Sequence, residues 1–214
     1  LSQAIAQLVD SLSTLSPIPH QLSVCFSWPE EVDPIEWLDA QPIYPKFYWQ
    51  TRDGREEVMA LGQVKTFTDP AAAEKVLSTN QRIWGGRSFD GRTARNQRCL
   101  QSFFFLPQIE VARQDDTWTL TVNLGDDLLK TQAALSKVTM AHPTLSPPEC
   151  HILSTEHSPA FPDWSAMIDR ALTHIEQTDL QKVVLARKTS LSLDRPVSAA
   201  QLLKASRDQN RANF

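Results

Sequence analysis

The sequence predicts an α+β fold, in which antiparallel strands are mixed with helices. Asp53-Gly54 lies between two strand-like runs, and this dipeptide is typical of a tight β-hairpin turn. Residues 118–124 alternate apolar and polar side chains, as expected for a strand with one buried face. Helical runs separate the hairpins without forming regular β-α-β units. This order favours an antiparallel arrangement over a parallel, doubly wound sheet.

Residues 1–142 are expected to form a scaffold region built from these hairpins and helices. Amphipathic spacing predicts helices at residues 2–15, 34–38, 70–77 and 127–140. Asp33-Pro34 and Asp69-Pro70 open two of them, because Asp caps a helix and Pro fits its first position. Ser2, and either Asp126 or Asp127, are the expected caps of the other two. Apolar, β-branched and aromatic runs predict strands at 22–28, 46–50, 57–65, 83–85, 102–106, 110–113 and 118–124.

Residues 143–162 are predicted to be a connection, because prolines recur at positions 143, 147, 148, 159 and 162. A catalytic region is then expected over residues 163–214. It begins with an amphipathic helix capped by Asp163, whose apolar stripe comprises Trp164, Met167, Ile168, Ala171, Leu172 and Ile175. A strand over residues 180–193 and a helix over 197–207 follow.

Lys182 and Arg187 flank an unbroken apolar run, Val183–Ala186. Such a run is typical of a strand that is buried on both faces. Side chains alternate along a strand, so Lys182 and Arg187 are expected to point to opposite faces. Arg187 is therefore expected to have a structural role, such as pairing with a carboxylate.

Lys182 has two interpretations. Lysine is almost never fully buried unless it is paired, so the simpler one is a side chain whose ammonium group reaches water. The other is a catalytic lysine, because burial or a nearby cation lowers a lysine's pKa and lets it act as a base near neutral pH. Both interpretations fit the hydrophobic pattern.

The bulk composition indicates a globular protein without nucleic-acid or membrane partners. The net charge of -4 and the pI near 5.7 argue against a general nucleic-acid partner. No apolar stretch approaches the roughly 20 residues of a membrane span, and the N-terminus lacks the features of a signal peptide. The three cysteines are widely spaced and fit neither a disulfide framework nor a zinc pattern, which favours a reducing cytoplasm. Cys25 and Cys99 are expected to be buried thiols.

The stretch from Gly85 to Arg98 is rich in arginine and could be imagined as a phosphate or nucleic-acid site. Its cations are Arg87, Arg92, Arg95 and Arg98. The stretch lacks the Gly-Lys-Ser/Thr ending of a phosphate-binding loop and any interleaved aromatic platform. A solvated loop is therefore the expected structure.

Cys150, His151 and His157 could be imagined as metal ligands, but their spacing matches no known site. A loop without metal is therefore expected there. Asp115-Asp116 and Asp126-Asp127 are expected to be turn and cap residues rather than a catalytic carboxylate pair, because their local roles already explain them.

An ordered set of short stretches resembles the chorismate-utilising enzymes. The set comprises Tyr44–Gln50, Arg82–Gly85, Phe103–Pro107 and, after an amphipathic helix, Lys182–Arg187. In this order and spacing they are similar to the isochorismate synthases of menaquinone biosynthesis. The resemblance spans essentially the whole chain and implies two packed antiparallel sheets flanked by helices.

The resemblance also implies an activity and a role for one residue. It implies an isomerase that converts chorismate to isochorismate with Mg²⁺, by attack of water at C2 and loss of the C4 hydroxyl. Lys182 matches the family's general base. The family's general acid and its Mg²⁺ ligands follow this strand, so they are expected beyond Phe214. Residues 1–214 are accordingly expected to be the N-terminal portion of a single chorismate-utilising domain.

Other members of the family remain alternatives. Aminodeoxychorismate synthase has a lysine at this position but uses it as a nucleophile, and salicylate synthase shares the lysine and also eliminates pyruvate. Anthranilate synthase usually has glutamine at this position, so Lys182 argues against it. From another class, the chain could be a non-catalytic, truncated scaffold.

Overall fold

The computed structural model describes residues 1–14, 16, 19–87, 102–125 and 127–210. The chain divides into two compact units. The first comprises Leu1–Leu145 together with Ser206–Phe214, and the second comprises Ser146–Ala205.

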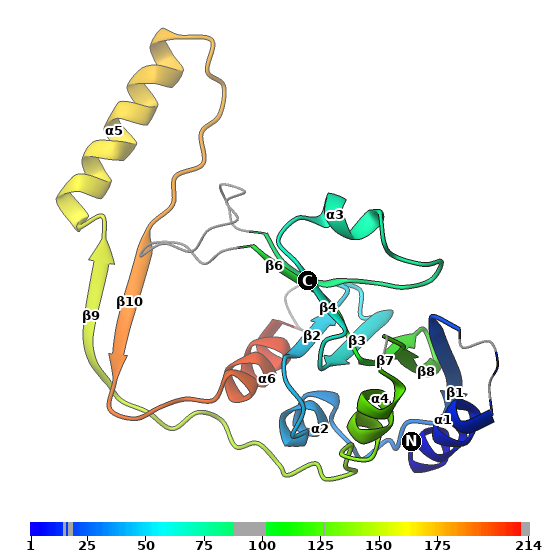
Figure 1. Cartoon of the computed structure of the whole chain (residues 1–214). Helices are drawn as coiled ribbons and strands as arrows, with labels where there is room; N and C mark the ends of the chain where they lie inside the picture. Colours follow the sequence, from blue (N-terminus) through cyan, green and yellow to red (C-terminus); the bar gives the residue numbers. More distant parts are fainter. Residues whose placement is uncertain (15, 17–18, 88–101, 126, 211–214) are drawn as a thin grey trace. The chain divides into compact units, whose positions relative to one another are not determined.

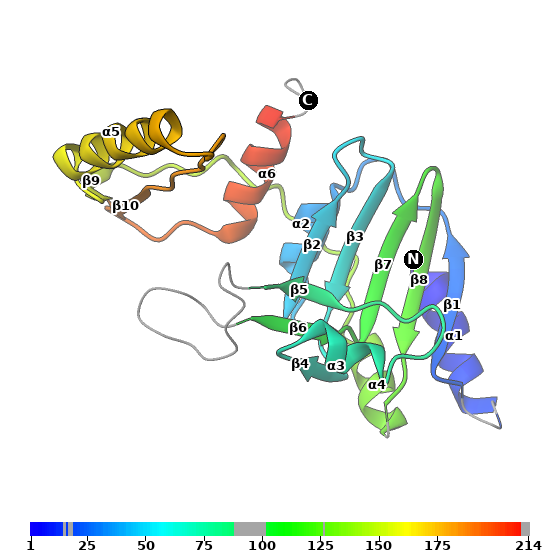
Figure 2. The same cartoon turned by 90° about the horizontal axis from the view of Figure 1, so that it is seen from above.

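The first unit is built on a five-stranded antiparallel sheet (Figure 2). Its strands, in spatial order, are β1 (Gln21–Phe26), β8 (Thr117–Asn123), β7 (Ile109–Gln114), β3 (Glu56–Leu61) and β2 (Lys46–Gln50). Gly54 makes the β2–β3 turn with a φ of 69°, and Asp115 makes the β7–β8 turn with a φ of 50°. Both turns lie where the sequence predicts them, because these residues tolerate the left-handed backbone region.

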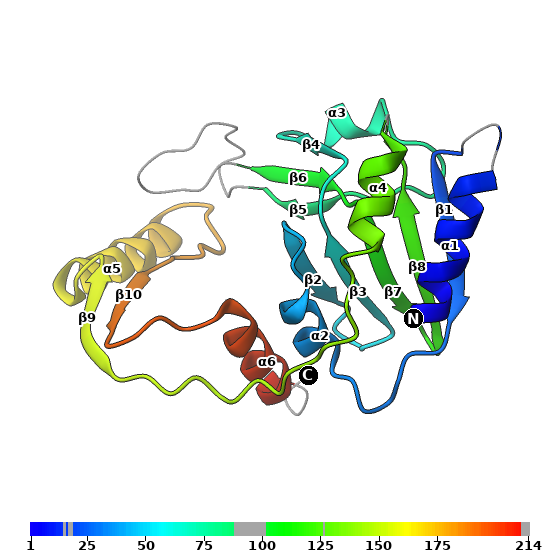
Figure 3. The same cartoon turned by 60° about the horizontal axis from the view of Figure 1, so that its bottom comes forward.

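One face of this sheet carries the main core. Helices α1 (Ser2–Thr14) and α4 (Leu128–Leu135) lie across it (Figure 3), and α2 (Pro34–Ala40) packs into the same core. The central residues of this core are fully or almost fully buried: Leu8, Trp37, Met59, Leu61, Ile109, Val111, Leu120, Val122 and Leu135. Asp33 caps α2 and Asp127 caps α4, as predicted, whereas Asp126 lies outside the described residues.

A three-stranded sheet, in the order β4 (Lys65–Phe67), β6 (Phe103–Leu106) and β5 (Trp84–Gly86), also belongs to the first unit. The prediction of one strand over 57–65 is wrong. The chain turns at Gly62, with a φ of 64°, and passes from β3 in the larger sheet to β4 in the smaller one. The short helix α3 (Pro70–Glu74) follows, capped by Asp69 as expected.

The second unit contains a two-stranded antiparallel ribbon and one long helix (Figure 1). Its elements are β9 (Ile152–Ser158), α5 (Phe161–Gln177), β10 (Lys188–Leu193) and the greater part of α6 (Ala199–Asn210). The prediction that residues 143–162 are only a connection is wrong, because β9 lies within them and pairs with β10. The prolines flank this strand and therefore do not interrupt its ladder.

Several helices differ from their predicted limits, and the helix predicted over 70–77 ends at Glu74. The helix predicted to extend to Met140 ends at Leu135, and the backbone of Thr139 bonds instead to the side chains of Trp37, in α2, and Gln41, directly after it. The helix predicted to be capped by Asp163 begins at Phe161, with Ala160 as its N-cap and Pro162 in its first turn. These differences change boundaries only. The α+β fold class, with antiparallel sheets flanked by helices, is confirmed.

Candidate active site around Lys182

Lys182 lies on an exposed segment that returns from the end of α5 to the start of β10. The predicted buried strand over residues 180–187 is wrong, and the strand begins only at Lys188. In the described part of the chain no strand pairs with Val183–Ala186, so these residues form no β-ladder. Val184 is 81% exposed as a result.

The apolar stripe of α5 is also uncovered. No residue of this helix is buried, and Ile168 and Leu172 are 37% and 54% exposed. The helical spacing was predicted correctly, but the core that the stripe was expected to meet is absent from the described residues. Lys182 therefore lies on a unit whose apolar surfaces face outward.

Arg187 does not pair with a carboxylate among the residues that the structure describes. Its Nε donates a hydrogen bond to the backbone carbonyl of Pro159, at 3.1 Å. The predicted partner is therefore wrong, because the side chain meets the turn between β9 and α5 rather than an acidic group. On the neighbouring ladder, Nδ1 of His157 lies 2.9 Å from the hydroxyl of Thr189.

The other candidate residues do not assemble into a second site. His157 lies on β9 rather than in the predicted loop, and the backbone of His151 donates to Asp194. Across the described ranges, no three His, Cys, Asp or Glu side chains lie close enough to hold a metal ion. Cys25 is exposed rather than buried, because it points to the polar face of the larger sheet, with Sγ 3.9 Å from the hydroxyl of Thr119.

Part of the arginine-rich stretch lies outside the described residues. This holds for Arg92, Arg95 and Arg98, and also for Cys99. Arg87 is described and is exposed.

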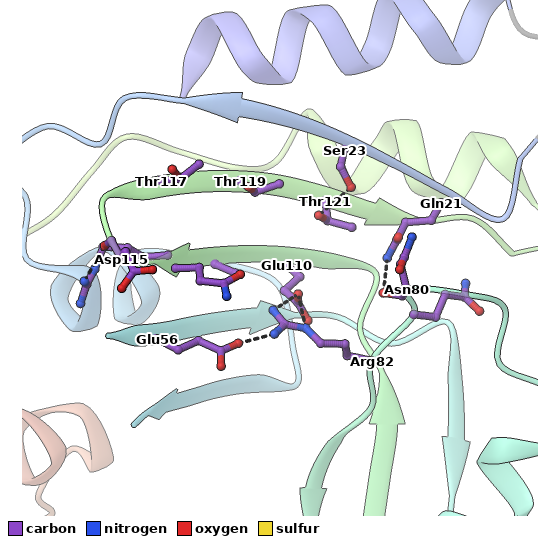
Figure 4. A pocket seen from close by; sticks show the side chains of 14 residues that line it. Gln21, Ser23, Glu56, Asn80, Arg82, Glu110, Asp115, Thr117, Thr119 and Thr121 are labelled. Carbon is purple, nitrogen blue, oxygen red and sulfur yellow. Dashed lines mark hydrogen bonds and ion pairs between the residues drawn. The ribbon is translucent and has the colours of Figure 1, made fainter. Parts of the chain in front are cut away.

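The polar face of the five-stranded sheet holds a pocket of about 710 Å³ that sequence reasoning did not identify (Figure 4). Hydroxyl and charged side chains line it, among them Ser23, Thr119, Thr121, Glu56, Arg82 and Glu110. The alternation on β8 signals this face, because the threonines between its apolar residues must point away from the core.

Arg82 and Glu110 form the centre of a charge network in this pocket. Nε and Nη2 of Arg82 donate to Glu110 at 3.1 and 2.6 Å, and Nη1 donates to Glu56. Trp84 Nε1 donates to the second oxygen of Glu110. Burial opposes the charged guanidinium, but the two carboxylates outweigh it and raise the pKa of Arg82. With these groups paired among themselves, the network joins β5 to the larger sheet and leaves no excess positive charge for an anion.

The profile of the chorismate-binding enzyme family matches residues 71–214 of this chain. The chain belongs to this family. The match includes Lys182 and the whole second unit. Among the described residues, no helix is long and apolar enough to cross a membrane.

Isochorismate synthases are among the similar proteins of this family. Isochorismate synthase MenF of Escherichia coli K12 is 33% identical over 223 residues, which cover 98% of this chain and 50% of that protein. MenF of Pasteurella multocida is 28% identical over 96% of this chain and 47% of its own length. The solved structure of the menaquinone-specific MenF from E. coli superposes with a TM-score of 0.83 at 29% identity, over 97% of this chain and 50% of that one. The chain thus spans about half the length of these relatives.

Proposed function

We propose that this chain forms part of an isochorismate synthase that converts chorismate to isochorismate for menaquinone biosynthesis, in the cytoplasm. One observation carries the proposal. Nearly the whole chain aligns with proteins named as isochorismate synthases, and the family match includes the segment that holds Lys182. We also propose that residues 1–142 are the scaffold and that the catalytic region begins near residue 163.

In the proposed reaction, water adds to C2 of the chorismate ring and the C4 hydroxyl leaves. Lys182 accepts a proton from the attacking water, and an acid supplies a proton to the departing hydroxide, so that one water enters and one leaves. The ring double bonds shift between these positions, and no oxidation or reduction occurs. The reaction is therefore an isomerisation that needs one base and one acid.

A lysine acts as a base near neutral pH when its charged form is disfavoured, for example by exclusion of water. Lys182 is exposed in this chain. We infer that the half of the relatives' length that the chain does not span covers Lys182 and supplies the acid. The exposed apolar side chains of α5 and of Val183–Ala186, which directly follows Lys182, are consistent with such a cover.

The family resemblance implies Mg²⁺, which would neutralise the substrate carboxylates when bound. The described residues do not provide a carboxylate cluster that fits the ion. No ligand is therefore assigned within this chain, and no step is derived through the metal.

The proposal is tested by replacing Lys182 in a protein that carries this chain and spans the full length of the relatives. Lys182→Ala should lower turnover of chorismate by about 10²- to 10⁴-fold, the usual contribution of a general base. Lys188→Ala, at the first residue of β10, is the matched control and should retain turnover.

Chromatography of the products distinguishes isochorismate from aminodeoxychorismate and from salicylate with pyruvate. Near-normal turnover in Lys182→Ala would exclude Lys182 as the base. Any product other than isochorismate from the unmodified enzyme would exclude the proposed reaction.

A further inference from the structure

The ladder between β9 and β10 stops at a defined position. Lys188 pairs with Ser158, and Arg187 and Pro159 would form the next pair in this register. Proline has no backbone N–H to donate, so the ladder cannot continue there with its normal hydrogen bonds. The chain needs another contact at this point if the two strands are to stay together.

The side chain of Arg187 supplies that contact. Its Nε donates to the carbonyl of Pro159 at 3.1 Å, at the position where backbone pairing ends. Pro159 precedes Ala160, the N-cap of α5, which makes no side-chain capping bond. Arg187 therefore joins the start of β10 to the start of α5.

Residues 178–187 run back beside α5 from its C-terminal end, as Figures 1 and 2 show. At one end of this segment, the hydroxyl of Thr178 donates to His174 at 2.7 Å and accepts from the backbone of Leu180 at 3.2 Å. At the other end is the Arg187 contact. Between them, residues 181–186 make no hydrogen bond to any residue within the described ranges. Within the described residues, hydrogen bonds therefore hold this segment at its two ends, with Lys182 between them.

We propose that Arg187 is a positioning residue for Lys182: its Nε–H bond to the Pro159 carbonyl fixes the β10 end of the segment and so sets where the catalytic amine lies. This inference rests on the proposed function of Lys182. It assigns to Arg187 a role that depends on a donor at the position of Nε and does not depend on the positive charge.

Three substitutions in the full-length enzyme separate the donor from the charge. Arg187→Gln keeps an N–H donor at the same number of bonds from Cα as Nε, but removes the charge. Arg187→Lys keeps the charge but places its nitrogen one bond further along. Arg187→Met keeps a long side chain and removes both. Steady-state kinetics with chorismate gives kcat and KM for each variant, and circular dichroism monitors folding.

Arg187→Met should lower kcat by about 10- to 100-fold with little change in KM, the usual effect of misplacing a catalytic group. Arg187→Gln should stay close to the unmodified enzyme, and Arg187→Lys should fall below Arg187→Gln. In a Lys182→Ala background the same Arg187→Met change should lower kcat by no more than about twofold, because coupled residues are non-additive. Such coupling is not expected of a residue that only stabilises the fold.

The inference is overturned by a Lys variant that is more active than the Gln variant, or by equal effects of Arg187→Met in the two backgrounds. If the Met variant does not fold, the comparison of Gln with Lys still decides between donor and charge. The proposed function fails separately, because its own test is whether Lys182→Ala alone lowers isochorismate formation.

Discussion

The hydrogen bonds of the Gln41 side chain are predicted to contribute strongly to the stability of the first unit. It is only 1% exposed and follows the last residue of α2. Its Nε2 donates to the carbonyls of Trp37, at 2.8 Å, and Thr139, at 3.1 Å, and its Oε1 accepts from the N–H of Thr139 at 3.0 Å. The two bonds to Thr139 join the end of α2 to the segment that follows α4, whereas the bond to Trp37 stays within the end of α2.

Gln41→Leu removes all three bonds while keeping a side chain of similar size. At about 1 kcal/mol for each hydrogen bond, the free energy of unfolding should fall by about 3 kcal/mol. Urea unfolding of the 214-residue chain, followed by tryptophan fluorescence, measures this loss. Gln7→Leu, at an exposed position on α1, is the matched control and should change the free energy by less than about 0.5 kcal/mol.

Gln41→Glu adds a test with a definite sign. A carboxylate can accept from the N–H of Thr139 but cannot donate to the two carbonyls, and burial raises the pKa of such a group above its unfolded value. The stability lost relative to the unmodified chain should therefore be largest at neutral pH. It should shrink as the pH falls through the raised pKa, because the protonated acid can donate. A pH-independent loss, or a Leu variant as stable as the unmodified chain, would refute this account of Gln41.

Burial opposes ionisation of Asp33, but Arg207 and the backbone N–H groups of the α2 cap outweigh it and hold the pKa of Asp33 below its usual value. Its contribution to stability is therefore fully present above the unfolded pKa of about 3.9 and is lost as the pH falls through the lower folded value. Asp33→Asn should flatten this acid dependence in urea unfolding between pH 5 and 2, whereas Asp10→Asn should not. Separately, the 214-residue chain alone should form no isochorismate when Mg²⁺ is added. Its described residues contain no cluster of metal ligands, and the segment next to Lys182 is open to water, with Val184 81% exposed. Detectable isochorismate would contradict this prediction.

Local signals predicted most of the fold, because the residues that cause them are neighbours in the chain. The Asp53-Gly54 turn and the caps at Asp33 and Asp69 lie where expected, and each depends on a few adjacent backbone groups. The alternation at 118–124 likewise predicted β8 and its buried face. The family resemblance rested on the order of such stretches, and the match to residues 71–214 confirms it.

The candidate site was less predictable, because its features depend on residues that are distant in the sequence. No local pattern pairs Arg82 with Glu110, or directs Arg187 to the carbonyl of Pro159 rather than to a carboxylate. The exposure of Cys25 could not be predicted from local sequence either, because it depends on which face of β1 the helices cover.

The sequence by itself determined the helices, the turns, the larger sheet's alternation and the lysine that marks the family. Only the tertiary structure decided which apolar runs are covered. Val183–Ala186 and the α5 stripe have the composition of buried elements, yet they are exposed in the described chain. The physical reason is that removing an apolar side chain from water is favourable, but the side chain becomes buried only where a second surface packs against it.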